Sequence, residues 1–362
     1  MKIALVHAHA WPEVRRGGER YLHDLAWYLG TAGHEVEVIT GSSTASAQQL
    51  GPVLHRRVRN EPGALARRIG ARPPETIGSR ALRPLLRRFD VVHALTESAT
   101  VASKLTGHRT VFTHLGYPDR VWLASQPRAL RWFQLACRMA DVTTAVSDAA
   151  AARVTECSGR PATGLFAGIR LDAFEPELAP REGPPTILFA SAQNEGNKGL
   201  DVLLAAMDLL LDAHPDARLQ VAGPGDGRWA FDALGERAER VRRAVDLVDP
   251  DTSMPDLYRS ATVTALPSTG EALGLVLLES LACGTPVVAG ADGGPTEVVT
   301  DDEIGRLVPV RDPAALATAL GQAIGLARTP GTASRCHEHA RRWDWATAIG
   351  PEHEALYRRV RG

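Results

Sequence analysis

Short runs of apolar residues alternate along the chain with longer segments whose apolar residues recur every three or four positions. In the first half, the short runs predict buried strands at residues 3–6, 36–39, 91–94, 110–112 and 142–146. The segments between them, such as 19–29 and 128–139, have the apolar spacing of amphipathic helices. This alternation predicts a parallel, doubly wound α/β sheet with helices on its faces.

The same pattern restarts after residues 175–185, a polar, proline-rich segment that we interpret as a linker between domains. Beyond it, the pattern predicts a helix at 200–211 and strands at 186–190, 219–222, 263–266 and 286–289. A chain of 362 residues is long enough for two domains of this kind. We therefore expect two Rossmann-like domains and a final helical segment, at residues 1–178, 179–340 and 341–362.

The composition, with 44% hydrophobic and 23% charged residues, is that of an ordinary globular protein. No apolar run approaches the roughly 18 residues that a membrane-spanning helix needs. The first seven residues fit a buried strand better than a signal peptide. The cysteines have no metal-ligand spacing, so we expect free thiols and a cytoplasmic protein. They are Cys137, Cys157, Cys283 and Cys336.

A net charge of −1 conceals opposite charges in the two halves. Residues 1–180 carry 23 basic and 16 acidic side chains, a balance of +7, whereas the remainder carries 18 and 26, a balance of −8. Ten arginines lie between residues 56 and 88. They form either a surface for an anionic lipid or acceptor, or a solvated helix and loop, and we favour the second. Only Phe89 is nearby to stack on bases, which argues against nucleic-acid binding.

Two glutamates in the second half, Glu271 and Glu279, stand eight positions apart. The first lies in a glycine- and proline-rich passage, and the second lies in an apolar helix that Gly284 ends. Carboxylates accept hydrogen bonds from sugar hydroxyls, and exposed amides at a helix start, here at Gly274 and Leu275, bind phosphate. The passage therefore suits a ligand that is both a sugar and a phosphate.

This passage resembles the Glu-x7-Glu signature of glycosyltransferase family 4, and further motifs extend the resemblance over essentially the whole chain. The resemblance implies the GT-B fold, in which two Rossmann-like domains face each other across a cleft and a final helix packs back on the first domain. In the family, the first glutamate lies beside the donor sugar and the second binds the ribose. These roles carry over to Glu271, as a catalytic residue, and to Glu279, in donor binding.

Other family motifs match elsewhere in the chain. Gly17-Gly18 at the start of the first predicted helix is similar to the family's Gly-Gly pair, which contacts the donor phosphate. Lys198 matches a Lys-Gly motif, where an ammonium stabilises the departing diphosphate. His114 matches a catalytic histidine close to the transferred sugar. The Gly-Pro-Gly-Asp-Gly segment at 223–227 resembles the family's nucleotide-side loop.

The chain also departs from the family pattern. An arginine usually precedes the lysine, but no arginine occurs between Arg181 and Arg218. A guanidinium binds phosphate through two hydrogen bonds, so its loss removes about 1–3 kcal/mol of binding free energy. Arg170, where the family has an aspartate, is one candidate to replace it.

Two further histidines lie in or after predicted strands of the first domain. We interpret His9 and His93 as acceptor-binding residues, although a lone histidine is more often structural. A histidine metal site is disfavoured, because no carboxylate pattern accompanies these residues.

The resemblance implies a retaining, metal-independent hexosyltransferase that uses a nucleotide-diphosphate sugar and holds no tightly bound cofactor. The donor that we expect is a UDP-sugar. Retention without an evident nucleophile implies a same-face, SNi-like attack by the acceptor oxygen. The expected acceptor is a bacterial natural product or a small glycoside. The alternatives are a membrane-associated glycolipid acceptor of phosphoinositide type, a non-catalytic sugar-nucleotide-binding protein, and an epimerase or phosphorylase of the same fold. The donor's sugar and base, and the oligomeric state, stay open.

Overall fold

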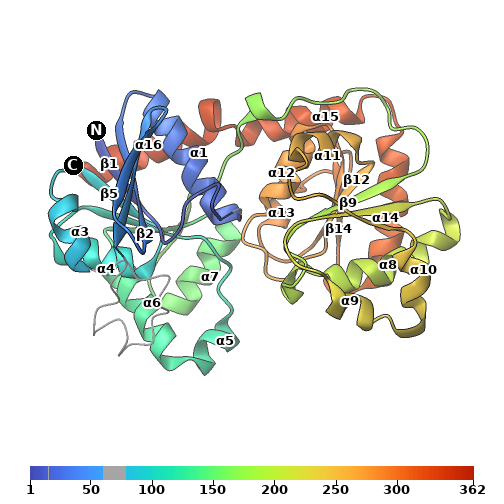
Figure 1. The fold of residues 1–362 in the computed structure, drawn as a ribbon, viewed down its shortest axis with the longest axis horizontal. Coiled ribbons are helices and arrows are strands. Elements are labelled where there is room, and N and C mark those ends of the chain that lie inside the picture. Colours follow the sequence, from blue (N-terminus) through green and yellow to red (C-terminus); the bar gives the residue numbers. More distant parts are fainter. Residues whose placement is uncertain (15, 60–78) are drawn as a thin grey trace. The chain divides into compact units, whose positions relative to one another are not determined.

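The computed structural model describes residues 1–14, 16–59 and 79–362 (Figure 1). Contacts divide the chain into two compact units, one formed by Met1–Gly168 with Asp344–Gly362 and the other by Ile169–Trp343. Each unit is a mainly parallel sheet covered by helices, as the alternating apolar pattern predicted. Within the described residues, no helix is long and apolar enough to cross a membrane.

The first unit contains an eight-stranded sheet in the order β3-β4-β2-β1-β5-β6-β7-β8. All neighbouring strands are parallel except β3 and β4, which are antiparallel at one edge. The five strands predicted for this half are confirmed as β1, β2, β5, β6 and β7. The bounds are β1 (Lys2–Val6), β2 (Glu35–Ser42), β3 (Ser46–Leu50), β4 (Val53–Arg59), β5 (Val91–Ala94), β6 (Thr110–His114), β7 (Val142–Ala145) and β8 (Thr163–Gly164).

The basic stretch at 56–88 begins in a strand, so the expectation of a helix and loop is wrong for its first residues. In β4, the Arg56 side chain forms an ion pair with Glu37 of the neighbouring strand β2. Only Val53 and Val58 of β4 are buried, so the strand has no continuous apolar run. Residues 60–78 of the stretch lie outside the described residues.

Helices cover the sheet of the first unit, and the predicted helices at 19–29 and 128–139 are confirmed as α1 and α6. The last helix of the chain, α16, also belongs to this unit and contacts α1, β5 and β6. The bounds are α1 (Gly17–Thr31), α3 (Ser79–Leu86), α4 (Glu97–Leu105), α5 (Arg120–Ser125), α6 (Pro127–Met139), α7 (Asp148–Ser158) and α16 (Gly350–Arg361).

The second unit contains six parallel strands in the order β11-β10-β9-β12-β13-β14. The predicted strands are confirmed as β9, β10, β12 and β13, and the predicted helix as α8. The strands are β9 (Thr186–Ala190), β10 (Arg218–Ala222), β11 (Val245–Leu247), β12 (Val263–Leu266), β13 (Val287–Gly290) and β14 (Gly305–Val308).

Apolar residues of α8 and α14 pack on the central strands of this second sheet and form its main core. Among the core residues, Leu203 and Leu320 are fully buried. The helices are α8 (Leu200–Ala213), α9 (Arg228–Asp232), α10 (Ala238–Arg242), α11 (Met254–Ser260), α12 (Leu275–Ala282), α13 (Pro295–Val298), α14 (Pro313–Ala327) and α15 (Thr332–Ala340).

Residues 175–185, interpreted from sequence as a linker, are bonded into the second unit. The amide of Glu177 donates to the carbonyl of Cys283, with N and O 3.1 Å apart. Arg181 donates from its side chain to the carbonyl of Ala261 and to Thr285 Oγ1, each over 3.1 Å. The boundary between the units therefore falls at residues 168/169, before this segment. A segment without periodic structure can still belong to a domain, because its polar groups form hydrogen bonds with neighbouring residues.

Candidate functional site

The sequence candidates of the second unit lie on loops that leave the carboxyl ends of neighbouring strands, or in α12, the helix that follows one of these loops. In open parallel sheets, this edge is where ligands bind. The loops are tied together: the amide of Gln193 donates to the carbonyl of Pro224, and that of Thr269 donates to the carbonyl of Asn197, each over 2.8 Å. The loops follow β9, β10, β12 and β13 and comprise residues 191–199, 223–227, 267–274 and 291–294.

Lys198 and Glu271 meet at this edge. Lys198 Nζ donates a hydrogen bond to Glu271 Oε2 over 3.0 Å, and the two side chains are only 21% and 13% exposed. Gly199 allows this approach, because its φ is +75° and an added Cβ would lie 2.3 Å from the carbonyl oxygen of Pro267. The structure thus joins two candidates that the sequence identified separately.

Asp292, in the loop after β13, accepts hydrogen bonds from the backbone amides of both Gly270 and Glu271. Its Oδ2 accepts a hydrogen bond from the Gly270 amide over 2.8 Å, and its carbonyl accepts one from the Glu271 amide over 3.3 Å. The Gly294 amide donates to the Glu271 carbonyl over 2.9 Å. Sequence reasoning missed Asp292, although an acidic residue directly before the Gly293-Gly294 pair was an available signal.

Glu279 lies in α12, which begins at Leu275 directly after Gly274. Gly274 has the left-handed φ of +88°, and no side chain caps the start of this helix within the described residues. The Tyr258 hydroxyl donates to Glu279 Oε2 over 2.7 Å. The ring of Tyr258 is buried while Glu279 is partly exposed, so the hydroxyl orients a carboxylate that a ligand can still reach.

Candidates of the first unit also gather at carboxyl ends of strands. His114 ends β6, and Gly17 and Gly18 open α1. A Cβ added to Gly18 would lie 2.9 Å from Cδ1 of Leu115, so α1 begins very close to the residue that follows His114. An added side chain at Gly18 would force the Leu115 side chain to shift.

Glu97 is a neighbour of His114 that sequence reasoning missed. His114 Nδ1 lies 3.9 Å from Glu97 Oε1, at the start of α4, and the two side chains are 23% and 29% exposed. Burial lowers the pKa of His114 to about 4, so the imidazole is neutral at pH 7. Burial also raises the pKa of the Glu97 carboxyl. No local sequence signal pairs these residues, because Glu97 begins α4 whereas His114 ends β6, the strand that follows it.

His93 has a structural position rather than the acceptor-binding role expected from sequence. Its side chain is fully buried, with Nδ1 2.6 Å from the Tyr357 hydroxyl and Nε2 2.6 Å from Thr113 Oγ1. Both ring nitrogens are therefore used inside the first unit, where they bond β5 to α16 and β6. His9 is partly exposed and stays a candidate, with its amide 3.3 Å from His7 Nδ1.

The structure brings Arg170 to Asp172, with Nη2 3.0 Å from Oδ2, so its guanidinium is directed at its own loop. Another arginine, Arg311, reaches the first turn of α8, where its Nη1 lies 2.7 Å from Asp201 Oδ2. Sequence reasoning did not single out Arg311. Which arginine replaces the one missing before Lys198 stays an open prediction.

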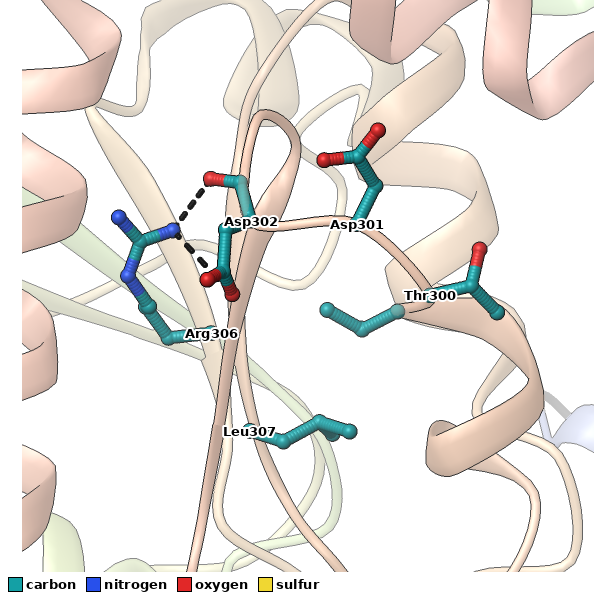
Figure 2. Close-up of a pocket in the computed structure, with 6 residues that line it drawn as sticks. Thr300, Asp301, Asp302, Arg306 and Leu307 are labelled. Carbon is teal, nitrogen blue, oxygen red and sulfur yellow. Dashed lines mark hydrogen bonds and ion pairs between the residues drawn. The ribbon is translucent and has the colours of Figure 1, made fainter.

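A hollow of about 470 Å³ lies on the second unit, lined by residues 299–302, 306 and 307. Figure 2 shows the Arg306 guanidinium turned toward the carbonyl and carboxylate of Asp302. The hollow lies where the chain enters β14, at the amino end of the strand and not at the edge that carries Lys198. We therefore do not assign the candidate site to it. No group of three or more His, Cys, Asp or Glu residues that could hold a metal ion occurs in the described ranges.

Two family models match the chain, "Glycosyltransferase Family 4" over residues 15–164 and "Glycosyl transferases group 1" over residues 184–325. The phosphatidyl-myo-inositol mannosyltransferase of Mycolicibacterium smegmatis is 30% identical over 389 residues, which cover 100% of this chain and 95% of that protein. The protein of the same name from Mycobacterium leprae is 36% identical, but the match covers 56% of this chain and 55% of the relative. The D-inositol 3-phosphate glycosyltransferase of Streptomyces scabiei is 27% identical over 100% of this chain and 94% of its own length.

Solved structures with the same fold include sucrose-phosphate synthase from Thermosynechococcus elongatus, with a TM-score of 0.82 and 23% identity over 99% of both chains. The Anabaena protein HepE in complex with UDP and glucose has a TM-score of 0.75 and 19% identity over 98% of this chain and 99% of its own. At these identities, the likeness establishes the fold alone. Together with the two family matches and the full-length relative, it shows that the chain belongs to glycosyltransferase family 4 and has the GT-B fold.

Proposed function

We propose that this protein is a retaining glycosyltransferase that moves a hexosyl group from a nucleotide-diphosphate sugar to an acceptor hydroxyl. The Lys198–Glu271 pair at the carboxyl edge of the second sheet is the observation that carries the proposal. In this pair, a cation that can stabilise a leaving phosphate lies beside a carboxylate that can accept hydrogen bonds from sugar hydroxyls. Membership of the family supports the reaction class.

The donor is held by the second unit in this proposal. The Lys198 ammonium stabilises the negative charge that develops on the departing diphosphate. Glu271, whose backbone Asp292 holds, accepts hydrogen bonds from sugar hydroxyls. Glu279, oriented by the Tyr258 hydroxyl, accepts hydrogen bonds from the ribose. The amides of Gly274 and Leu275, at the start of α12, add donors for the phosphates.

The first unit supplies His114 and the amides at Gly17 and Gly18. A neutral imidazole can donate or accept a hydrogen bond beside the sugar without opposing the positive charge of the anomeric centre. The acceptor oxygen attacks the anomeric carbon on the face from which the diphosphate departs, so a new C–O bond forms as the bond to the diphosphate oxygen breaks. That diphosphate oxygen takes the acceptor proton. No metal is required in this scheme.

A UDP-sugar is the donor we propose, supported by the UDP and glucose held by the Anabaena protein of the same fold. For the acceptor, the sequence favoured a natural product or small glycoside. The names of the relatives favour a second candidate, an inositol-bearing acceptor, either an inositol phosphate or phosphatidyl-myo-inositol. We retain both candidates, because either acceptor presents ring hydroxyls to the same site.

Calorimetry with UDP, GDP, dTDP and their sugars tests the donor site, using the wild type and Glu279→Ala. We expect one nucleotide series to bind selectively and to lose affinity in the variant. Glu338→Ala, which removes an exposed carboxylate of α15, is the matched control and should bind normally. Absence of binding by every nucleotide sugar contradicts the proposal. Binding without transfer to any hydroxyl acceptor, including inositol and phosphatidylinositol, indicates a non-catalytic binding protein instead.

A further inference from the structure

Two consecutive helices of the first unit, α5 and α6, are labelled in Figure 1. They carry an exposed surface that is both apolar and basic. Val121 is 80% exposed and Trp122 is 52% exposed, although both belong to the short helix α5. Leu123 holds this helix in place, because it is buried in a core cluster that α6 and α7 share. The α5–α6 surface is defined here by Val121, Trp122, Arg128, Arg131, Leu135 and Arg138.

The basic residues of α6 lie on one helix face. Arg128, Arg131 and Arg138, with Leu135, are spaced by three, four and three positions and are all exposed. The buried residues of the same helix, Phe133, Ala136 and Cys137, lie on the opposite face. None of the three arginines makes an ion pair within the part of the chain that the structure describes. Their charges therefore have no ion-pair partner among residues 1–14, 16–59 and 79–362.

Acidic groups near this surface are already engaged. Residues 120–140 contain four arginines and no aspartate or glutamate. The carboxylate of Asp119 caps α5 by accepting the Trp122 amide over 2.9 Å. Glu156 is paired with both Arg120 and Arg153, with nitrogen–oxygen distances of 2.7 Å. The net field of the surface is therefore positive.

We propose that the α5–α6 surface binds the anionic headgroup layer of a lipid bilayer. Exposed arginines attract anionic headgroups, and a tryptophan beside them favours the interface between water and hydrocarbon. Because no described helix can span a membrane, the association is peripheral. The partner is thus a lipid surface and not an acidic protein, which would leave Trp122 without its preferred environment.

This inference goes beyond the proposed transfer reaction and does not require it. If the acceptor is a lipid, the surface brings the enzyme to the layer that contains it. If the acceptor is soluble, the surface still localises the protein. Vesicle binding and nucleotide binding are separate measurements, so the failure of one is distinguishable from the failure of the other.

The test is co-sedimentation of the full chain with vesicles of phosphatidylcholine alone or mixed with phosphatidylglycerol. We expect binding to the mixed vesicles only, weakened by salt. Replacing Arg128, Arg131 and Arg138 together by glutamine should reduce the partition coefficient by about fivefold per arginine, on the order of 100-fold in total. Trp122→Ala should reduce the partition coefficient at low and at high salt concentration, because the contribution of the indole ring is not electrostatic.

Matched controls are Arg243→Gln and Leu247→Ala, which remove an exposed arginine and an exposed leucine from the second unit. Both should bind vesicles like the wild type. Unfolding temperatures equal to that of the wild type establish that the α5–α6 variants fold. The proposal is overturned if the wild type does not bind mixed vesicles or if the variants bind them as well as the wild type does. It is also overturned if an acidic protein displaces the wild type from the vesicles.

Discussion

Replacing Asp292 with alanine tests whether this residue positions Glu271 for sugar transfer. The change removes the Oδ2 atom that accepts the Gly270 amide over 2.8 Å and leaves the backbone contact to Glu271 intact. A hydrogen bond to a charged acceptor contributes about 1.5–3 kcal/mol. Without it, the loop after β12 is free to leave the conformation that pairs Glu271 with Lys198.

The expected loss follows from that free energy. If 1.5–3 kcal/mol separates the held loop from released ones, the fraction of molecules in the held state falls, and kcat/KM for the donor sugar falls by roughly 10- to 150-fold. Asp292→Asn keeps an oxygen acceptor but loses its charge, so only part of the activity should return. The affinity for free UDP should fall much less than kcat/KM, because Glu279 and Tyr258 are untouched.

The assay is steady-state release of UDP across donor concentrations, combined with calorimetry of UDP alone. Asp302→Ala is the matched control, since that carboxylate is 89% exposed and its pair with Arg306 spans 3.8 Å. The reasoning is refuted if Asp292→Ala keeps full kcat/KM, or if UDP affinity falls as much as kcat/KM does. Equal losses in Asp292→Ala and Asp292→Asn would also show that the hydrogen bond is not the cause.

Three further predictions concern other contacts. Gly199→Ala should lower the unfolding temperature by several degrees, because the new Cβ would lie 2.3 Å from a carbonyl oxygen, whereas Gly196→Ala, with 3.9 Å of clearance, should not. Tyr258→Phe should weaken UDP binding about tenfold in calorimetry, through loss of the 2.7 Å bond to Glu279, while an equal affinity would refute the orienting role. Burial lowers the pKa of His353 from 6.5 to about 4, so its contribution to stability is complete above pH 6.5 and is lost as the pH falls toward 4, by up to about 1.4 kcal/mol per pH unit. Urea unfolding at several pH values should show this slope, and it should be shallower in His353→Gln.

The strands in the middle of each sheet were predictable because both of their faces are covered, so they read as continuous apolar runs. β1, β9, β12 and β13 illustrate this, and each was predicted within two residues of its observed bounds. The edge strands β3 and β11 were not predictable, because their side chains are mostly exposed and carry no such run. The parallel two-domain architecture follows from the pattern, since strands that alternate with helices form parallel sheets.

Motifs were sufficient to select Lys198, Glu271 and Glu279 as candidates, because each stands in a local context of glycine, proline and apolar residues. The same reasoning assigned site roles to both His114 and His93. Both are histidines in or after predicted strands, but the packing of Tyr357 against the sheet buries His93 completely. Burial of a single side chain depends on what another element places over it, and no local spacing encodes that.

The amino-acid sequence alone therefore determined where helices and strands form and which candidate residues stand at their ends, because hydrophobic periodicity and turn chemistry act over a few residues. The tertiary structure alone, through the order of strands in each sheet, decided which of these candidate residues lie close together. Lys198 and Asp292 reach Glu271 only because β9, β12 and β13 are neighbours in the sheet and end at the same edge. The Glu97–His114 pair and the return of α16 to the first unit have the same origin. These contacts join residues far apart in sequence. Closing such long loops lowers the entropy of the chain, and this loss is offset only when the whole sheet has formed.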